Sequence, residues 1–219
     1  MDTVQYIALS MGTAWASGIN LYAAVFMLGY LGTTGNIALP PEMMVVTDPL
    51  VMTAAGLMYC VEFFADKTPG VDTAWDSLHT FIRIPVGAVL AMSAVGDTTP
   101  AVELAAFLAG GSLTAATHAT KAGSRVLINT SPEPASNWTA SIAEDFMVIA
   151  GVWAALTHPL VFVIFLVLFI ALMIWLLPKI WRGIKRIFSA IKNFFTAKKP
   201  EKDEEAVAAL DSPVESQSK

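Results

Sequence analysis

Hydrophobic residues along this chain are gathered into long runs that short polar segments separate. We read six apolar elements, at residues 5–32, 49–66, 80–96, 100–126, 138–157 and 159–181. Most approach the length of about 20 residues that a helix needs to cross the hydrocarbon core of a bilayer. The pattern therefore predicts an all-α integral membrane protein with about six membrane helices. The third element is short for a full span, so we expect a short or re-entrant segment there.

The segment 62–85, between the second and third apolar runs, mixes charges with aromatic and aliphatic side chains. If it is helical from Thr73, then Asp76, His79 and Arg83 share one face, because residues three and four apart are neighbours. Thr73 with Asp76 also fits a capping box that would start this helix. We expect the polar face to line a cavity within the membrane. The alternative is a capped, solvated connector.

Composition supports the membrane assignment. Of the 219 residues, 55% are hydrophobic and 14% are charged, whereas an ordinary soluble domain is about 25% charged. The net charge of −5 comes mostly from residues 200–219, where six acids stand against two lysines. Nothing resembles a folded basic surface with interleaved aromatics, so we expect no nucleic-acid partner. Cys60 is the only cysteine, which excludes an intramolecular disulfide and a cysteine-based metal site.

Lysine and arginine positions predict the orientation of the chain in the membrane. A basic run from Lys179 to Lys199 follows the last apolar element and should lie in the cytoplasm. Six crossings would then place the N-terminus in the cytoplasm as well. The predicted outer connections, 33–48, 97–99 and 157–158, contain no Lys or Arg. A proline follows each of them, at the position that proline favours at a helix start.

The C-terminal region divides into two further segments after the membrane domain at 1–181. Residues 182–199 place apolar side chains at helical spacing with Arg and Lys opposite, which predicts an amphipathic basic helix at the inner membrane surface. Residues 200–219 are acidic and poor in aromatics, which predicts a disordered tail.

A weak internal repeat relates residues 5–96 to residues 100–181. G-I-N-L-Y-A and L-P-P-E in the first half correspond in position to T-H-A-T-K-A and S-P-E-P in the second. Two units of three spans must have opposite orientations. This pattern predicts two inverted three-helix repeats, with a site near the midplane where they meet.

Charged and polar residues inside the predicted spans are the candidate site, because such residues are costly there and usually face an interior. As substrate-binding groups we select Asn20, Tyr22, Arg83, His118, Lys121 and Arg125. As proton- or ion-coupling groups we select Glu62, Asp66, Asp76, His79, Glu144 and Asp145. The structural alternatives are an ion pair between Glu62 and Lys121, and a capping box formed by Ser141 and Glu144.

Other chemistries find less support. The three histidines lack zinc-site spacing, and there is no Walker-type phosphate loop or G-x-S-x-G motif. A Mg²⁺ or Mn²⁺ site built from Glu62, Asp66, Glu144 and Asp145 stays open, because hard cations prefer oxygen ligands. We expect no cofactor and no catalytic residues.

Several motifs taken together resemble a known family. They are G-I-N-L-Y-A, L-P-P-E, V-E-F-F-A-D-K-T-P-G-V-D-T-A-W-D-S-L-H-T-F-I-R-I-P-V-G-A, T-H-A-T-K-A-G-S-R and N-T-S-P-E-P-A-S-N-W. The chain resembles, over residues 5–185, the bacterial inner-membrane family catalogued as domain of unknown function 4126. The resemblance implies a multi-pass protein of the bacterial inner membrane and supplies no established activity. The inverted halves with polar breaks are also similar, at the level of fold, to small lipid-phosphate translocases.

These observations favour a transporter or flippase-like carrier of an anionic small molecule or lipid-phosphate, coupled to protons. Its expected partners are membrane lipids and that anion, and a homo-oligomer stays open. The alternative is a non-enzymatic membrane scaffold or assembly factor whose intramembrane charges are structural ion pairs. A membrane enzyme that uses the carboxylates and a metal ranks third. A water-accessible cavity around Lys121 would favour transport, and a dry, paired core would favour the scaffold.

Overall fold

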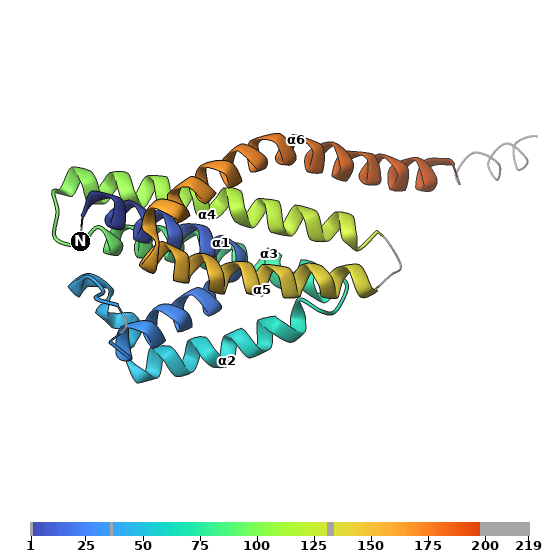
Figure 1. The fold of residues 1–219 in the computed structure, drawn as a ribbon. Helices are drawn as coiled ribbons and strands as arrows, with labels where there is room; N and C mark the ends of the chain where they lie inside the picture. Colours follow the sequence, from blue (N-terminus) through green and yellow to red (C-terminus); the bar gives the residue numbers. More distant parts are fainter. Residues whose placement is uncertain (1, 36, 131–133, 198–219) are drawn as a thin grey trace, which may run out of the picture. The chain divides into compact units, whose positions relative to one another are not determined.

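A computed structural model describes residues 2–35, 37–130 and 134–197, and these form helices without any strand (Figure 1). The prediction of an all-α protein is confirmed. The elements are α1 (Thr3–Thr33), the 3₁₀ helix η1 (Pro41–Thr47), α2 (Pro49–Ala65), α3 (Val71–Ala94), α4 (Pro100–Ile128), α5 (Pro134–Thr157) and α6 (Pro159–Ala197). The chain divides into two units, 1–180 and 181–219, which are described separately.

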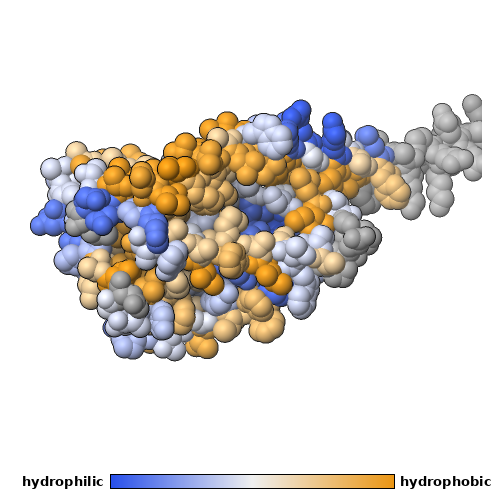
Figure 2. All heavy atoms as spheres, in the orientation of Figure 1, coloured by the Kyte–Doolittle hydropathy of each residue, from blue (hydrophilic) through white to orange (hydrophobic). Residues whose placement is uncertain are grey.

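Four helical segments in the described part of the chain are long and apolar enough to cross a membrane. They are Thr3–Thr33, Val71–Ala94, Ala135–Thr157 and Pro159–Phe194. A fifth is added if η1 and α2, which meet at a bend of 61°, form one span. Large apolar side chains such as Phe64, Phe81 and Leu168 are exposed, and Figure 2 shows extensive hydrophobic surface. The molecule is therefore built to face lipid.

The predicted helix starts at prolines are confirmed. α2 begins at Pro49, and the Asp48 carboxylate caps it by accepting a hydrogen bond from the Leu50 N–H at 2.7 Å. α4 begins at Pro100 after the Thr99 cap, and α6 begins at Pro159. These boundaries are set locally, because proline needs no N–H partner at the first helical position.

Helix α1 is broken in its middle at Asn20, which has φ −146° and ψ 96°. The Asn20 side-chain oxygen caps the second half by accepting a hydrogen bond from the Ala23 N–H at 2.9 Å. The chain then turns back (Figure 1, dark and lighter blue), so that both ends of α1 lie at the same end of the bundle. Near the start of α1, Tyr6 packs beside Gly96. Near its end, Gly29 packs against η1 and α2.

The re-entrant element is thus the first and not the third. The prediction of a short third element is wrong, because α3 is a continuous helix of 24 residues that includes Pro85. Its charged first half stays helical because the side chains of Asp72, Asp76 and Arg83 are buried against other helices. The Thr73 capping box is also wrong, since the helix begins at Val71 and no side chain caps it.

Close approach of α1 to α4 depends on a glycine next to the break. A Cβ atom added to Gly18 would lie 1.8 Å from the Thr117 hydroxyl and 2.7 Å from the Thr114 carbonyl oxygen. Small residues at helix crossings let backbones approach closely in membrane bundles. This contact fixes the position of the neighbouring Ile19 and Asn20 against α4.

One turn before Gly18, α1 packs on α6 through aromatic rings. Trp15 is fully buried and makes edge contacts with Phe162, Phe165 and Phe169 at ring-centroid distances of 5.4–5.8 Å. Edge-to-face packing of this kind suits the charge distribution of aromatic rings.

The second unit begins at Trp181 and is helical as far as Ala197, and the amphipathic helix at the inner membrane surface stays a prediction. Trp181, Phe188 and Ile191 are exposed, and the Lys185 ammonium lies 5.3 Å from the Trp181 ring centroid. The predicted acidic tail lies outside the described residues, as do Lys198 and Lys199.

Candidate functional site

The break in α1 exposes a backbone carbonyl to two basic side chains. Arg83 Nη1 of α3 and Lys121 Nζ of α4 both donate to the Ile19 carbonyl oxygen, at 3.1 and 3.0 Å. A helix end concentrates partial negative charge on its last carbonyls, so a cation is favourable there. The two halves of α1 therefore meet beside two positively charged side chains, one from α3 and one from α4.

Arg83 is fully buried and joins α3 to α2. Its Nη2 atom donates to Glu62 Oε1 at 2.5 Å, and its Nη1 atom lies 3.2 Å from Asp76 Oδ1. Glu62 and Asp76 are also fully buried. Charges removed from water need such partners, because desolvation otherwise costs several kcal/mol per ion.

Lys121 is the centre of the ion-pair network. Its Nζ atom donates to Asp66 Oδ2 at 2.7 Å and to Glu62 Oε1 at 3.3 Å. It also lies 3.7 Å from Asp76 Oδ1 and 3.8 Å from Glu144 Oε2. Acids from α3 and α5, and from α2 and its C-terminal end, thus converge on one ammonium group. This confirms that the buried acids lie within salt-bridge distance of the predicted cations.

Arg125, one turn further along α4, binds the start of α5. Its Nη2 atom donates to Glu144 Oε2 at 2.5 Å, and its Nη1 atom donates to the Asn137 side chain and backbone carbonyl. It is fully buried, so it does not extend to the interface. Because α5 already begins at Pro134, the Ser141–Glu144 capping box is wrong.

His118 is held by a chain of hydrogen bonds that fixes its neutral form. Its Nδ1 atom lies 3.4 Å from Arg83 Nη1, which can only donate, so Nδ1 accepts. Its Nε2 atom then donates to the Thr80 hydroxyl at 2.7 Å, and that hydroxyl donates to the Asp76 backbone carbonyl. His118 thus belongs to the Arg83 network without being one of its cations.

His79 and Tyr22 lie at the edge of this network rather than in it. His79 Nδ1 bonds the Trp75 carbonyl at 2.9 Å, and the ring stacks on Trp75 at 4.0 Å. Tyr22 meets the His79 ring edge-on at 5.8 Å. The predicted face of Asp76, His79 and Arg83 exists, but its members contact different groups.

A second, smaller group surrounds Asp145 on the other side of Asn20. Asn20 Nδ2 donates to Asp145 Oδ1 at 3.0 Å, and Lys67 Nζ lies 4.0 Å from Asp145 Oδ2. Lys67 also donates to the Ser141 hydroxyl and sits 3.0 Å from the Phe63 ring centroid. Burial lowers the pKa of the Lys67 ammonium, and the nearby Asp145 opposes that shift.

Several acidic oxygens in the site have no hydrogen-bond partner among the described residues. They are Glu62 Oε2, Asp66 Oδ1, both oxygens of Asp76, and Asp145 Oδ2. Five acids (Glu62, Asp66, Asp76, Glu144 and Asp145) face four bases (Lys67, Arg83, Lys121 and Arg125). The network therefore has one more carboxylate than it has cations.

The cluster is largely closed to solvent, and its most exposed members are Glu144 and Asp145. The Glu144 side chain is 16% exposed, whereas those of Glu62 and Lys121 are 0% and 2% exposed. The cavities described below lie elsewhere, and Figure 2 shows hydrophilic surface in a recess between α4 and α5. Within the described part of the chain, no group of three His, Cys, Asp or Glu side chains could hold a metal ion.

Comparison with known proteins places the chain in a family. The model of the domain of unknown function DUF4126 matches residues 7–179. The chain belongs to the DUF4126 family. No curated protein and no solved structure matched it significantly. The matched region of this DUF4126 protein contains every member of the ion-pair network and ends before the second unit.

Sequence reasoning missed four participants in the site. Lys67 was not selected because it follows the second apolar element, but its ammonium group donates to the Phe63 carbonyl one turn earlier and lies over the Phe63 ring. Asn137 accepts a hydrogen bond from Arg125, and Asn129 donates to the buried Asp72. No sequence pattern indicates either contact. The Ile19 carbonyl is a backbone atom, and the polar Asn20 beside it was the available signal.

Proposed function

We propose that this DUF4126 protein is a membrane transporter or flippase-like carrier of an anionic small molecule or lipid-phosphate, coupled to protons. The single observation that carries the proposal is the broken helix α1, whose Ile19 carbonyl meets Arg83 and Lys121 in the middle of the bundle. A break is tolerated at membrane depth only where protein or water satisfies the freed backbone groups. Substrate sites of secondary transporters are built at such breaks.

The cations Arg83, Lys121 and Arg125 are the groups that would receive an anion. In the closed arrangement the acids Glu62, Asp66 and Glu144 occupy them. An anionic substrate would compete with these acids for the same guanidinium and ammonium groups. Binding therefore requires that one or more acids move away or take up a proton, and proton uptake would couple substrate binding to protons.

Asp76 is our candidate for the residue that carries the coupling proton. Arg83 makes its hydrogen bond to Glu62 and Lys121 makes its shortest contact to Asp66, so Asp76 is left with ion-pair distances but no hydrogen bond. A buried carboxylate without a donor is costly, and a proton removes that cost. The network also has one more acid than it has bases, so a single proton would balance its charge.

Opening of the site would begin at Glu144. It is the most exposed acid of the network, it bonds Arg125, and it lies within ion-pair distance of Lys121. Release of Glu144 from these cations would uncover both of them toward the recess between α4 and α5 (Figure 2). The closed conformation described above would then be one state of an alternating-access cycle.

We place the protein in the bacterial inner membrane with its C-terminus in the cytoplasm, and this keeps positive charge on the inner side. Residues 1–66 and 84–120 contain no Lys or Arg, and they include both ends of α1 and the connections at 34–48 and 95–99. Because α1 turns back, the segment before it belongs on the outer side, which replaces the expectation that both termini are cytoplasmic. Reporter fusions at Asp2, Asn36 and Asp97 should all behave as periplasmic.

The scaffold remains the second candidate, and one observation favours it. Arg83, Lys121 and Arg125 are all paired, and the described cavities do not reach them. A network of this kind can fix one arrangement of helices without binding anything. The two candidates differ in whether the site ever opens to water.

Cysteine accessibility distinguishes them without knowledge of the substrate. Cys60 is the only cysteine, and it is exposed on α2, so Cys60→Ser gives a cysteine-free background. In that background Thr80→Cys and Ser141→Cys place thiols beside the network, and Ala14→Cys is a fully buried control. In membrane vesicles, a membrane-impermeant thiol reagent should modify the first two and not the third. Equal protection of all three thiols from both sides would reject transport and support the scaffold.

A further inference from the structure

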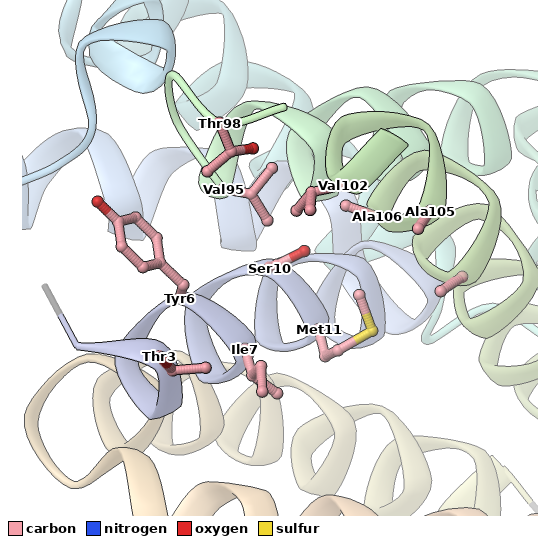
Figure 3. A pocket seen from close by; sticks show the side chains of 11 residues that line it. Thr3, Tyr6, Ile7, Ser10, Met11, Val95, Thr98, Val102, Ala105 and Ala106 are labelled. Carbon is pink, nitrogen blue, oxygen red and sulfur yellow. The ribbon is translucent and has the colours of Figure 1, made fainter. Parts of the chain in front are cut away.

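An open cavity of about 510 Å³ lies between the first half of α1 and the start of α4, at the opposite end of the bundle from Arg125 (Figure 3). It is within the range of roughly 300–1,000 Å³ that small-molecule sites occupy. α1 contributes one face at helical spacing, α4 contributes Val102, Ala105, Ala106 and Ala109, and the connection between α3 and α4 contributes Thr98. The cavity exists because the alanine side chains of α4 are small. No residue of the ion-pair network lines the cavity.

The lining of the cavity is apolar along most of its length. The Ser10 hydroxyl donates to the Ala91 carbonyl at 2.7 Å and is therefore satisfied within the bundle. The Tyr6 and Thr98 side chains lie near the helix ends with their hydroxyls apart from each other, whereas Met11 and Ala105 lie deeper (Figure 3). The cavity thus has one polar end and an apolar body, which matches a lipid with its headgroup at the interface.

The apolar body opens sideways rather than into the bundle. Ile7 and Val102 are 47% and 45% exposed, and Ala105 and Ala109 are exposed as well. Ile7 belongs to α1, which is long and apolar enough to cross a membrane, and the exposed α4 residues beside it are also apolar, so we expect the opening to face hydrocarbon. An acyl chain can enter from that side without crossing water.

Acidic side chains border the polar end, and no Lys or Arg among the described residues lines the cavity. Glu42 Oε2 lies 3.5 Å, and Tyr6 Cε1 3.9 Å, from the position that a Cβ on Gly96 would occupy, so they border the same point. Asp97 is exposed next to Thr98. Because residues 1–66 and 84–120 lack Lys and Arg, a purely anionic headgroup would find no cation here. An ammonium group would find the carboxylates of Glu42 and Asp97.

We infer that this cavity binds a phospholipid whose headgroup bears a primary ammonium, with one acyl chain between α1 and α4. The headgroup lies among Tyr6, Thr98, Glu42 and Asp97, and the acyl chain passes along Ile7, Met11 and the three alanines. The site is separate from the proposed carrier site and does not depend on it. It would fix the first half of α1 against α4 at the outer end of the bundle.

The test uses the full chain in nanodiscs made from equal amounts of phosphatidylethanolamine and phosphatidylglycerol. Lipid retained after gentle release is identified by native mass spectrometry. We expect the wild-type protein to retain phosphatidylethanolamine in preference. Ala105→Leu with Ala109→Leu should fill the cavity and lose that lipid, whereas Ala119→Leu, at an exposed alanine of α4 outside the cavity, should keep it.

A second double variant tests the contribution of the acidic side chains. Glu42→Gln with Asp97→Asn should keep a bound lipid but lose the preference for the ammonium headgroup. The proposal is overturned if the filled variant retains as much lipid as the wild type. It is also overturned if the wild type prefers phosphatidylglycerol. Thermal unfolding followed by tryptophan fluorescence checks that each variant is folded, and Ala105→Leu alone replaces the double variant if that one fails to fold.

Discussion

The bundle of residues 2–180 buries its side chains in two opposite ways. In the half that contains the ends of α2 and α4, which we term the charged half, four bases and five acids contact one another with no apolar layer between them. In the other, apolar half, Trp15 and phenylalanines of α6 pack edge to face, and a cavity opens to lipid. Ion pairs therefore fix the helix arrangement in the charged half, and the packing of apolar side chains fixes it in the apolar half.

This difference teaches where a membrane bundle can change conformation. An apolar side chain gains little free energy by leaving lipid to pack against another helix, since lipid tails are as apolar as leucine. Ion pairs in a dry interior hold the structure in one arrangement until a proton or a competing ion changes the charge. We therefore expect the charged half to contain the switch, and the apolar half to hold the first half of α1 in place.

The largest effect should follow loss of the central cation. Lys121→Met leaves Asp66 without its 2.7 Å partner and removes one donor from the Ile19 carbonyl. Removing one partner of a buried ion pair costs about 3–5 kcal/mol. Thermal unfolding in detergent should therefore begin at a clearly lower temperature than in the wild type.

Lys121→Met with Asp66→Asn should recover much of that loss, because the unpaired charge is gone. Lys67→Met is the matched control at the edge of the network, 4.0 Å from its acid, and should cost less. If Lys121→Met were as stable as the wild type, the charged half would not be held together by charge.

The seam between the two halves should be the next most sensitive place. Gly18→Ala puts a methyl group 1.8 Å from the Thr117 hydroxyl and close to a backbone carbonyl that cannot rotate away. Overpacking of this kind costs roughly 1–3 kcal/mol. Gly111→Ala is the control, since its Cβ would meet only Ala88 Cβ, at 3.1 Å. Equal unfolding temperatures for the two variants would contradict the close approach of α1 to α4.

A smaller change in stability, but a specific spectroscopic one, should follow Asp76→Asn. If Asp76 holds the surplus proton, the amide replaces a neutral acid and the network keeps its charge. Infrared difference spectra in hydrogen and deuterium oxide should lose the carbonyl band of a protonated carboxylic acid. Asp72→Asn, a buried acid on the same helix bonded to Asn129, should retain that band. A band unaffected by Asp76→Asn would assign the proton to another group.

The smallest effect should come from the acidic tail. Deletion of residues 200–219 should leave expression and thermal stability in detergent unchanged, because an acidic, aromatic-poor segment buries little apolar area. The undeleted protein is the control. A large loss of folded protein would show that the tail packs on the bundle.

The sequence predicted most of what depends on neighbours along the chain. The all-α class, the helix starts at Pro49, Pro100 and Pro159, and the helical face that joins Asp76 to Arg83 all follow from local pattern. The ion pair between Lys121 and Glu62 was predicted as a structural alternative, because burying a charge without a partner is costly. The inverted repeat stays a prediction, although α1 is broken whereas α4 is continuous.

What the sequence could not give is the break itself. G-I-N-L-Y-A contains one polar residue in an apolar run, which an unbroken helix also tolerates. The break is favourable because Arg83 and Lys121, 64 and 102 residues further on, receive the freed carbonyl. Pattern reasoning assigned the re-entrant shape to the third element because that apolar run is short, and it treated the helix predicted from Thr73 as a separate feature, although the two form the single helix α3.

The same feature bears on the order of assembly in the membrane. When α1 first enters lipid, neither Arg83 nor Lys121 has been synthesised, and lipid cannot bond the Ile19 carbonyl. An unbroken helix of 31 residues satisfies that carbonyl internally and is long enough to span the bilayer. We therefore expect α1 to insert as a simple transmembrane helix and to fold back only after α3 and α4 arrive. The re-entrant hairpin would then be a late product of folding, formed when the second cation is in place.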